Sequence, residues 1–215
     1  ADWLIGDYRF ESGFGCFSLS YQGEKKADFQ LAMIGRHNVE NATAVAALCL
    51  RLGLTADEIN SAFKTFQGIK RRQEVVGVKN NITVLDDFAH HPTAIRLTLE
   101  AVKEAYPGQR LWAIFEPRSA TSRQKIFEQD FPDSFLVADK VIIAGLFAPE
   151  KIIEEERLDP DQVVTRLRQK GCDAHFIKEV DDIVAFMAEN VESGDVVLVM
   201  SSGGFGGIHQ KILDR

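Results

Sequence analysis

The sequence lacks any apolar run long enough to cross a membrane, and its amino terminus lacks the charged-then-apolar pattern of a secretion signal. It has only three cysteines, Cys16, Cys49 and Cys172, which are widely spaced and form no CxxC pair. An odd and scattered set of this kind indicates neither a disulfide framework nor a thiolate metal site. These absences favour a cytoplasmic protein with no membrane partner.

A phosphate-binding loop of the form GxxxxGK[ST] is also missing, and the chain contains no Gly-Lys pair at all. Because that loop is the usual cradle for a triphosphate, any ATP chemistry needs residues outside this chain. The chain opens on Ala1, without Met, and enters strand-like sequence almost at once. We therefore expect that part of the protein is missing.

Charge and composition exclude two further classes of protein. The 32 acidic and 25 basic residues give a net charge of -7, and no run of Lys and Arg is long enough to follow a phosphate backbone. Nucleic acid is therefore a poor candidate partner. With 45% hydrophobic residues in 215, the chain has enough apolar mass for one or two cores, so disorder is not expected.

The first part of the chain has the pattern of strands followed by two helices. Short strands are predicted around residues 3–5, 14–21 and 29–34, at the edge of a larger sheet. The first helix has an apolar stripe of Val45, Leu48, Cys49 and Leu52. The second begins at residues 55–58 with a Thr-x-x-Glu capping box.

After residue 68 the pattern changes to short apolar strands that alternate with amphipathic helices. This alternation predicts an α/β fold with a doubly wound, mostly parallel, six-stranded sheet. Pro92 and Asp159-Pro160 mark helix starts, and Asp181 is a predicted helix cap. The boundary divides the chain into 1–68 and 69–215. The predicted strands are residues 74–78, 82–86, 111–115, 141–144, 174–177 and 196–200.

Polar or glycine-rich segments come directly after three of these strands, at residues 86–92, 116–123 and 201–207. In an open parallel sheet, ligands bind beyond the carboxyl ends of the strands. We therefore predict that Asp87, Arg118 and the glycines flanking Phe205 gather at one edge of the sheet and face a common ligand.

The first of these segments offers carboxylates that could bind ribose hydroxyls and two imidazoles that titrate near neutrality. Equally, Asp87 and His91 could simply cap the next helix. A metal site is rejected, because adjacent histidines cannot easily chelate one ion from a helix and no third ligand is obvious nearby.

The other two segments have the composition of anion-binding sites. Residues 116–123 place Arg118, Ser119 and Arg123 at an expected helix start, which favours a carboxylate or phosphate, although a solvated helix start with a surface ion pair is the plainer interpretation. Four glycines surround Phe205, which permits close backbone approach but is also common for packing reasons.

Two segments near the first helix and the boundary carry further candidates. Gly35-Arg36-His37-Asn38-Val39-Glu40-Asn41 begins a helix whose amides could bind a purine edge, or Asn38 could be the helix cap. The charge run Lys70-Arg71-Arg72 lies at the boundary, where a solvated linker is the default interpretation.

Taken in order, these segments resemble the Mur ligase family, which joins amino acids or peptides to UDP-N-acetylmuramate precursors. The resemblance covers residue 35 to the end and includes Arg71-Arg72-Gln73-Glu74 and Asp87-Phe88-Ala89-His90-His91-Pro92, in which Phe88 replaces the usual Tyr. It implies that residues 1–68 are the last part of a central ATP-binding domain and that 69–215 are the whole carboxy-terminal, peptide-binding domain.

The resemblance also implies roles for individual residues. Asn38 and Asn41 would contact adenine, Arg72 would reach the ATP phosphates, Asp87 would bind ribose and His90 would line the nucleotide site. Catalytic roles would fall to Arg72 and His90. Acceptor binding would fall to Arg118, Ser119, Arg123, Ser201, Ser202, Gly203, Gly204 and Phe205. ATP and Mg2+ would be the cofactors, with the main Mg2+ ligands outside this chain.

Within the family, the segments 115–119 and 201–209 look like the member that joins a murein tripeptide, L-alanyl-γ-D-glutamyl-meso-diaminopimelate, to UDP-N-acetylmuramate during recycling. Ser202 stands where that member usually has Asn. The reaction implied passes through an acyl phosphate. The alternatives are the member that adds L-alanine, and a non-catalytic module that binds a nucleotide or peptide.

Overall fold

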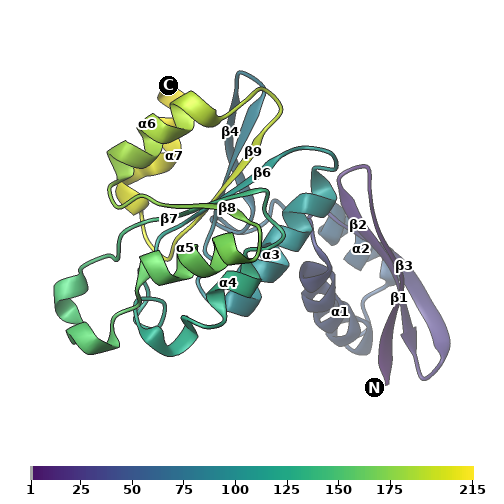
Figure 1. The fold of residues 1–215 in the computed structure, drawn as a ribbon. Coiled ribbons are helices and arrows are strands. Elements are labelled where there is room, and N and C mark those ends of the chain that lie inside the picture. Colours follow the sequence, from purple (N-terminus) through teal and green to yellow (C-terminus); the bar gives the residue numbers. More distant parts are fainter. Residues whose placement is uncertain (1) are drawn as a thin grey trace. The chain divides into compact units, whose positions relative to one another are not determined.

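The computed structural model describes residues 2–215, which form two compact units. The first unit ends at Ile69 and the second runs from Lys70 to Arg215. The first unit contains β1 (Trp3–Glu11), β2 (Phe14–Tyr21), β3 (Glu24–Leu31), α1 (Arg36–Arg51) and α2 (Ala56–Thr65) (Figure 1). Its three strands pair antiparallel in the order β1-β2-β3. Within the described residues they form a three-stranded sheet and do not join the larger sheet of the second unit.

The helices of the first unit cover one face of this small sheet. Phe17 and Phe29 of the sheet pack with Val39 of α1 and with Phe63 of α2. The capping box of α2 is confirmed, since the Thr55 hydroxyl accepts from the Glu58 amide and the Glu58 carboxylate accepts from the Thr55 amide.

The stripe predicted for α1 is wrong for three of its four residues, while the fourth, Cys49, is partly buried against the core of the first unit. Val45, Leu48 and Leu52 are 51%, 61% and 71% exposed. The buried face of α1 is instead Val39, Ala42 and Ala46.

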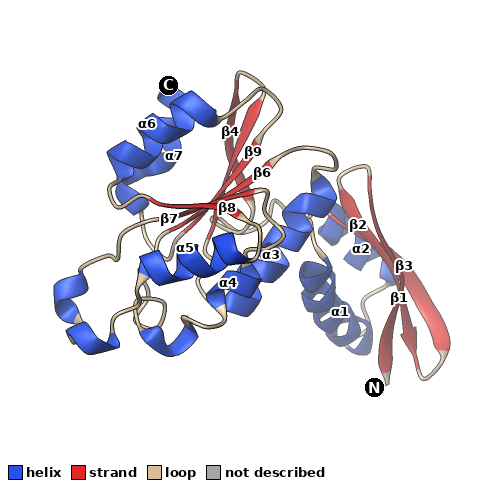
Figure 2. Ribbon diagram, in the orientation of Figure 1, coloured by secondary structure: helices blue, strands red, loops and turns tan. Residues whose placement is uncertain are grey.

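The second unit contains the predicted six-stranded sheet, whose strands lie in the order β4-β5-β9-β6-β7-β8 (Figure 2). Only the edge strand β4 runs antiparallel to its neighbour. The strands are β4 (Glu74–Lys79), β5 (Ile82–Asp87), β6 (Leu111–Phe115), β7 (Lys140–Ile143), β8 (Asp173–Phe176) and β9 (Val196–Met200). The helices are α3 (Pro92–Ala105), α4 (Phe131–Ser134), α5 (Pro160–Gln169), α6 (Val180–Asn190) and α7 (Ile208–Asp214). Short 3₁₀ turns lie at Lys125–Phe127, Pro149–Lys151, Glu154–Glu156 and Phe205–Gly207.

Both faces of this sheet are covered by helices, as its continuous apolar strands require (Figure 1). Alternate strand residues such as Trp112 and Val197 pack against α6 and α7. Phe115, on the opposite face, stacks on Phe131 and Phe135 with ring centroids 5.4 and 5.5 Å apart. The predicted doubly wound α/β fold is therefore confirmed.

Two predicted caps have different outcomes. Asp159 caps α5, where its carboxylate accepts from the amides of Asp161 and Gln162. Asp181 does not cap α6, because the helix begins one residue earlier, after Glu179. Asp181 lies in the first turn and pairs with Lys211 instead.

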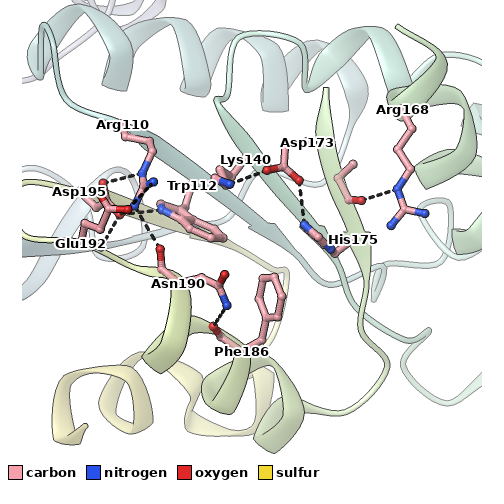
Figure 3. A network of polar contacts seen from close by, with 11 residues as sticks. Arg110, Trp112, Lys140, Arg168, Asp173, His175, Phe186, Asn190, Glu192 and Asp195 are labelled. Carbon is pink, nitrogen blue, oxygen red and sulfur yellow. Dashed lines mark hydrogen bonds and ion pairs between the residues drawn. The ribbon is translucent and has the colours of Figure 1, made fainter. Parts of the chain in front are cut away.

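A polar network joins the amino-terminal ends of the central strands (Figure 3). Asp195, directly before β9, accepts two hydrogen bonds from the Arg110 guanidinium, at 2.9 and 2.7 Å. It also accepts from Nε1 of Trp112 at 2.8 Å and from the Glu192 amide at 2.8 Å. The Asp195 residue is only 3% exposed. This carboxylate therefore anchors β9, β6 and the turn after α6 to one another.

Candidate functional site

The three predicted segments meet at the carboxyl edge of the second unit's sheet. Strands β5, β9 and β6 are parallel neighbours, and Asp87 and Phe115 both pair in register with Met200. The Ser201 amide donates to the Asp87 carbonyl at 3.1 Å, and the Glu116 amide donates to the Met200 carbonyl at 3.0 Å. The loops after these three strands, which are far apart in sequence, thus begin side by side.

Arg118 lies at this edge with neighbours on three sides. Its guanidinium carbon is 3.5 Å from the centroid of the Phe147 ring, and its Nη1 is 3.5 Å from Oε1 of Glu116. The backbone of Gly203 forms the third side, since a Cβ atom there would stand 1.9 Å from Nε of Arg118. The side chain is still 27% exposed. Arg118 is therefore held in place while it presents N–H donors to an anionic ligand.

Two buried groups beneath Arg118 hold the loops together. Ser201 is 0% exposed and Glu116 is 7% exposed. The Ser201 hydroxyl donates to Oε2 of Glu116 at 2.5 Å and accepts from the Gly203 amide at 2.9 Å. The Ser201 hydroxyl is thus used inside the protein and has no exposed surface, and its contact with the ligand stays a prediction.

Residues 119–123 form a turn, so the predicted helix start is wrong. The Ser119 hydroxyl donates to the Ser122 hydroxyl at 2.8 Å and accepts from the Ser122 amide at 3.1 Å. The Arg123 guanidinium donates to the carbonyls of Phe147 and Ala148 at 2.9 and 3.1 Å. Arg123 therefore holds the loop after β7 in place, and no helix dipole contributes to anion binding here.

The glycine-rich loop has its own internal anchor. Phe205 is 1% exposed and packs in the core formed with α6 and α7, and its contact with a ligand stays a prediction. Ser202, Gly203 and Gly204 remain partly exposed or exposed. Gly206 and Gly207 adopt φ angles of 59° and 70°, a region that glycine enters at little cost.

Four residues around this edge adopt a strained backbone conformation. Arg71, Gln73, Ala148 and Phe205 have φ angles of 61°, 52°, 47° and 41° although none is glycine. Such conformations cost free energy and persist where the surrounding structure holds them, often at functional sites.

Asp87 is 2% exposed and its carboxylate is used within the unit. Oδ1 accepts from the Ala89 amide at 2.7 Å, and Oδ2 accepts from the Gln73 amide at 2.9 Å. Burial raises the pKa of this carboxyl group, while the two amides oppose the rise. Asp87 thus organises the turn after β5, and its contact with ribose stays a prediction.

The two histidines after β5 differ in what they contact. The His91 ring accepts from the Thr93 amide at 3.3 Å and caps α3, as the plainer interpretation of this segment had it. Nδ1 of His90 lies 2.9 Å from the Phe88 carbonyl, which can only accept. Nδ1 must therefore carry a proton, and in the neutral ring Nε2 is left as an acceptor for a ligand.

The adjacent arginines at the start of the second unit also differ. Arg72 is exposed, with its guanidinium carbon 5.6 Å from the centroid of the Phe88 ring. Arg71 is half-buried and donates to the carbonyls of Ser201 and Gly203. The structure thus adds Arg71 and Phe147 to the site. Phe147 lies just beyond a predicted strand of the same sheet, so the strand pattern could have placed its loop beside the other three.

In the first unit, Asn38 and Asn41 are three residues apart on α1 and therefore on neighbouring positions of one helix face. The N-cap of α1 is Gly35, with φ 88° and no side-chain cap, so Asn38 is not the cap. The side-chain amide of Asn38 donates to the Ile34 carbonyl at 2.8 Å. Contact of either residue with adenine stays a prediction.

Neither a metal-binding cluster nor a membrane-spanning helix is present in residues 2–215. No group of three or more His, Cys, Asp or Glu side chains could hold a metal ion there. Within the same residues, no helix has the length and hydropathy needed to span a membrane.

Comparison with known proteins identifies similar sequences. Residues 71–203 match the family described as Mur ligase, glutamate ligase domain. A UDP-N-acetylmuramate--L-alanine ligase from Caldanaerobacter subterraneus subsp. tengcongensis is 37% identical over 216 residues, which cover 100% of this chain and 46% of that protein. A UDP-N-acetylmuramate--L-alanyl-gamma-D-glutamyl-meso-2,6-diaminoheptandioate ligase from Escherichia coli K12 is 37% identical over 193 residues, which cover 89% of this chain and 40% of that protein.

A solved structure has the same fold. The UDP-N-acetylmuramate-alanine ligase from Thermotoga maritima gives a TM-score of 0.83 at 23% identity, over 100% of this chain and 45% of that one. The chain spans about half the length of the curated relatives it matches.

Proposed function

The chain belongs to the Mur ligase family, and we propose that it is part of an ATP-dependent ligase that joins UDP-N-acetylmuramate to an acceptor beginning with L-alanine. The proposed reaction transfers a phosphoryl group from ATP to the lactyl carboxylate of the muramate. The L-alanine amine then attacks the acyl phosphate, so that an amide bond forms and inorganic phosphate leaves.

The arrangement of Arg118 is the observation that carries this proposal. An arginine held between an aromatic ring, a carboxylate and a glycine backbone is suited to bind a carboxylate in one orientation. Every acceptor in the proposed reaction ends in at least one carboxylate. We assign Arg118, with the exposed parts of Ser202, Gly203 and Gly204, to the acceptor, and Ser119 to the turn that supports Arg118.

Each unit carries residues that we assign to the nucleotide. We assign adenine to Asn38 and Asn41, ribose to Asp87, the phosphates to Arg72 and the edge of the nucleotide site to His90. Bound Mg2+ would neutralise charge on the phosphoryl group during its transfer. Residues 2–215 offer no cluster of three metal-binding side chains, so this chain is not assigned the main Mg2+ ligands.

Two acceptors fit this reaction, and both present the amine of an L-alanine. The comparisons favour free L-alanine, because the relative named for it matches the whole of this chain. The segments 115–119 and 201–209 favour the murein tripeptide, because they resemble the recycling member of the family. The same amide bond forms with either acceptor, and the tripeptide differs from free L-alanine only in the two residues attached to its alanine.

A substrate comparison with the full-length protein tests the proposal. ADP release and amide formation are measured with ATP, Mg2+ and UDP-N-acetylmuramate, and with either L-alanine or the tripeptide as acceptor. We expect amide formation with at least one of them, and the ratio of their kcat/KM values identifies the acceptor. Binding of a nucleotide or peptide, with no ADP released in the presence of either acceptor, would instead support a non-catalytic module. A GxxxxGK[ST] loop in the upstream reading frame would argue against that alternative.

A further inference from the structure

Arg71 makes contacts with three separate segments of the second unit. Its Nε donates to Oδ2 of Asp86 in β5 at 3.2 Å. Its Nη2 donates to the Ser201 carbonyl at 2.5 Å and to the Gly203 carbonyl at 2.7 Å. The side chain is 31% exposed. A single guanidinium thus connects the first residues of the unit to β5 and to the glycine-rich loop.

The backbone of Arg71 is held as firmly as its side chain. Its amide donates to the Glu74 carboxylate at 2.7 Å, and its carbonyl accepts from the Phe88 amide at 2.9 Å. These bonds keep Arg71 at φ 61°, a conformation that costs free energy in any residue other than glycine. The neighbouring structure therefore imposes the strained position from which the side chain reaches the loop.

The contact with Gly203 links Arg71 to Arg118. Arg118 packs directly on the Gly203 backbone, where a Cβ atom would stand 1.9 Å from its Nε. The carbonyl of that same glycine accepts from Arg71. A displacement of Arg71 would release the Gly203 peptide and remove one of the three neighbours that hold Arg118.

We propose that Arg71 is a positioning residue that holds the Ser201–Gly203 backbone in the conformation in which Arg118 and the loop bind the acceptor. Arg71 itself touches neither substrate nor nucleotide. The role rests on the proposed function, since it presumes that Arg118 binds the acceptor. It also separates two adjacent arginines: Arg71 affects acceptor binding through the Ser201–Gly203 backbone, whereas Arg72, which is exposed, is the one assigned to ATP.

Kinetics of full-length variants test this separation. Arg71→Gln removes the charge and the fork of donors, so KM for the acceptor should rise about tenfold while KM for ATP stays within about twofold. Arg72→Gln should have the converse effect. Arg71→Lys keeps the charge but cannot donate in the same fork, so its effect should be intermediate. Lys70→Gln, at an exposed neighbouring position, is the matched control and should change neither constant.

Hydrogen exchange of the amides in residues 201–207 supplies a readout that needs no substrate. Exchange should be faster in Arg71→Gln than in wild type and unchanged in Arg72→Gln and Lys70→Gln. If Arg71→Gln fails to fold, Arg71→Lys carries both measurements. Unchanged exchange, or acceptor and ATP constants that rise together, would overturn the inference. Faster exchange in a protein that ligates no acceptor would overturn the proposed function and leave the tie between Arg71 and the loop standing.

Discussion

Phe147 supports the charged end of Arg118, and this contact sets an expectation for a single substitution. Phe147→Leu keeps an apolar side chain but removes the aromatic face that lies 3.5 Å from the guanidinium. We expect a three- to tenfold rise in KM for the acceptor, of the order of one cation–π interaction at a partly exposed site. Steady-state kinetics of the full-length ligase measure the change, with Arg118→Ala as the reference for complete loss.

Two companion variants isolate the aromatic contact. Phe147→Tyr keeps the ring and should leave KM for the acceptor near the wild-type value. Phe66→Leu changes a phenylalanine of similar exposure, 41% against 40%, that belongs to the first unit, and it should also leave KM for the acceptor unchanged. If Phe147→Leu and Phe66→Leu behave alike, the Phe147 ring does not help Arg118 to bind the acceptor. If Arg118→Ala leaves acceptor affinity intact, Arg118 does not bind the acceptor.

The sequence predicts which segments meet at this edge better than which atoms face outward. Parallel strands bring their carboxyl ends together, so the meeting of Asp87 and Arg118 can be predicted from strand pattern alone. Whether a polar side chain points outward depends on its hydrogen-bond partner. Ser201 turns inward because Glu116, 85 residues away, accepts a hydrogen bond from its hydroxyl. Arg71 has the sequence pattern of a linker residue because its partner Gly203 is 132 residues away.

Among the elements, the strands of the large sheet can be predicted from the sequence because they are short, apolar and separated by strong helix signals. The buried face of α1 cannot, because two of its faces have the same spacing. Both faces follow the spacing i, i+3, i+7. The exposed set is Val45, Leu48 and Leu52, and the buried set is Val39, Ala42 and Ala46. Hydrophobicity favours the first set, but small side chains let the helix approach the sheet closely, so the alanine face is buried.

The anchor at Asp195 gives a prediction at the scale of the strands it joins. Asp195→Asn should lower the free energy of unfolding by about 2 to 3 kcal/mol at neutral pH, since a neutral amide replaces a buried carboxylate bonded to a guanidinium. Urea unfolding in a Trp3→Phe background measures this, because Trp112 then remains as the single tryptophan and donates directly to Asp195.

The loss of unfolding free energy in Asp195→Asn should depend on pH in a defined direction. Burial disfavours the charged form of Asp195, but hydrogen bonds from Arg110, the Glu192 amide and Trp112 outweigh it and lower its pKa. A lowered pKa in the folded state adds stability above the unfolded-state value of about 3.9, and this is lost as pH falls through the folded-state pKa. The difference between wild type and Asp195→Asn should thus be constant above about pH 5 and shrink below about pH 4.

Asp181 provides the matched control for the Asp195→Asn substitution. Its side chain is 83% exposed and pairs with Lys211 in solvent. Because exposed ion pairs contribute little, Asp181→Asn should change the free energy of unfolding far less than Asp195→Asn. Equal losses in the two variants, or a difference that grows as pH falls, would contradict the anchor.

On the scale of the whole molecule, the second unit supplies the residues proposed for acceptor binding, whereas neither unit supplies a phosphate loop. Arg118, Phe147, Glu116 and Gly203 all belong to the unit from Lys70 to Arg215. The residues that we propose for acceptor binding therefore all belong to a single unit. The phosphate loop on which ATP chemistry depends is absent from all 215 residues of the sequence. Acceptor binding and turnover should accordingly be separable in the purified chain.

We expect the 215-residue chain to release no ADP when mixed with ATP, Mg2+, UDP-N-acetylmuramate and the acceptor that the substrate comparison identifies. The same chain should bind that acceptor in isothermal titration calorimetry, because the contacts around Arg118 need no residue outside the second unit. Binding should be lost in Arg118→Ala and retained in Lys70→Gln. Turnover by this chain would show that phosphoryl transfer does not require the missing loop. Acceptor binding that survives Arg118→Ala would place the carboxylate site elsewhere.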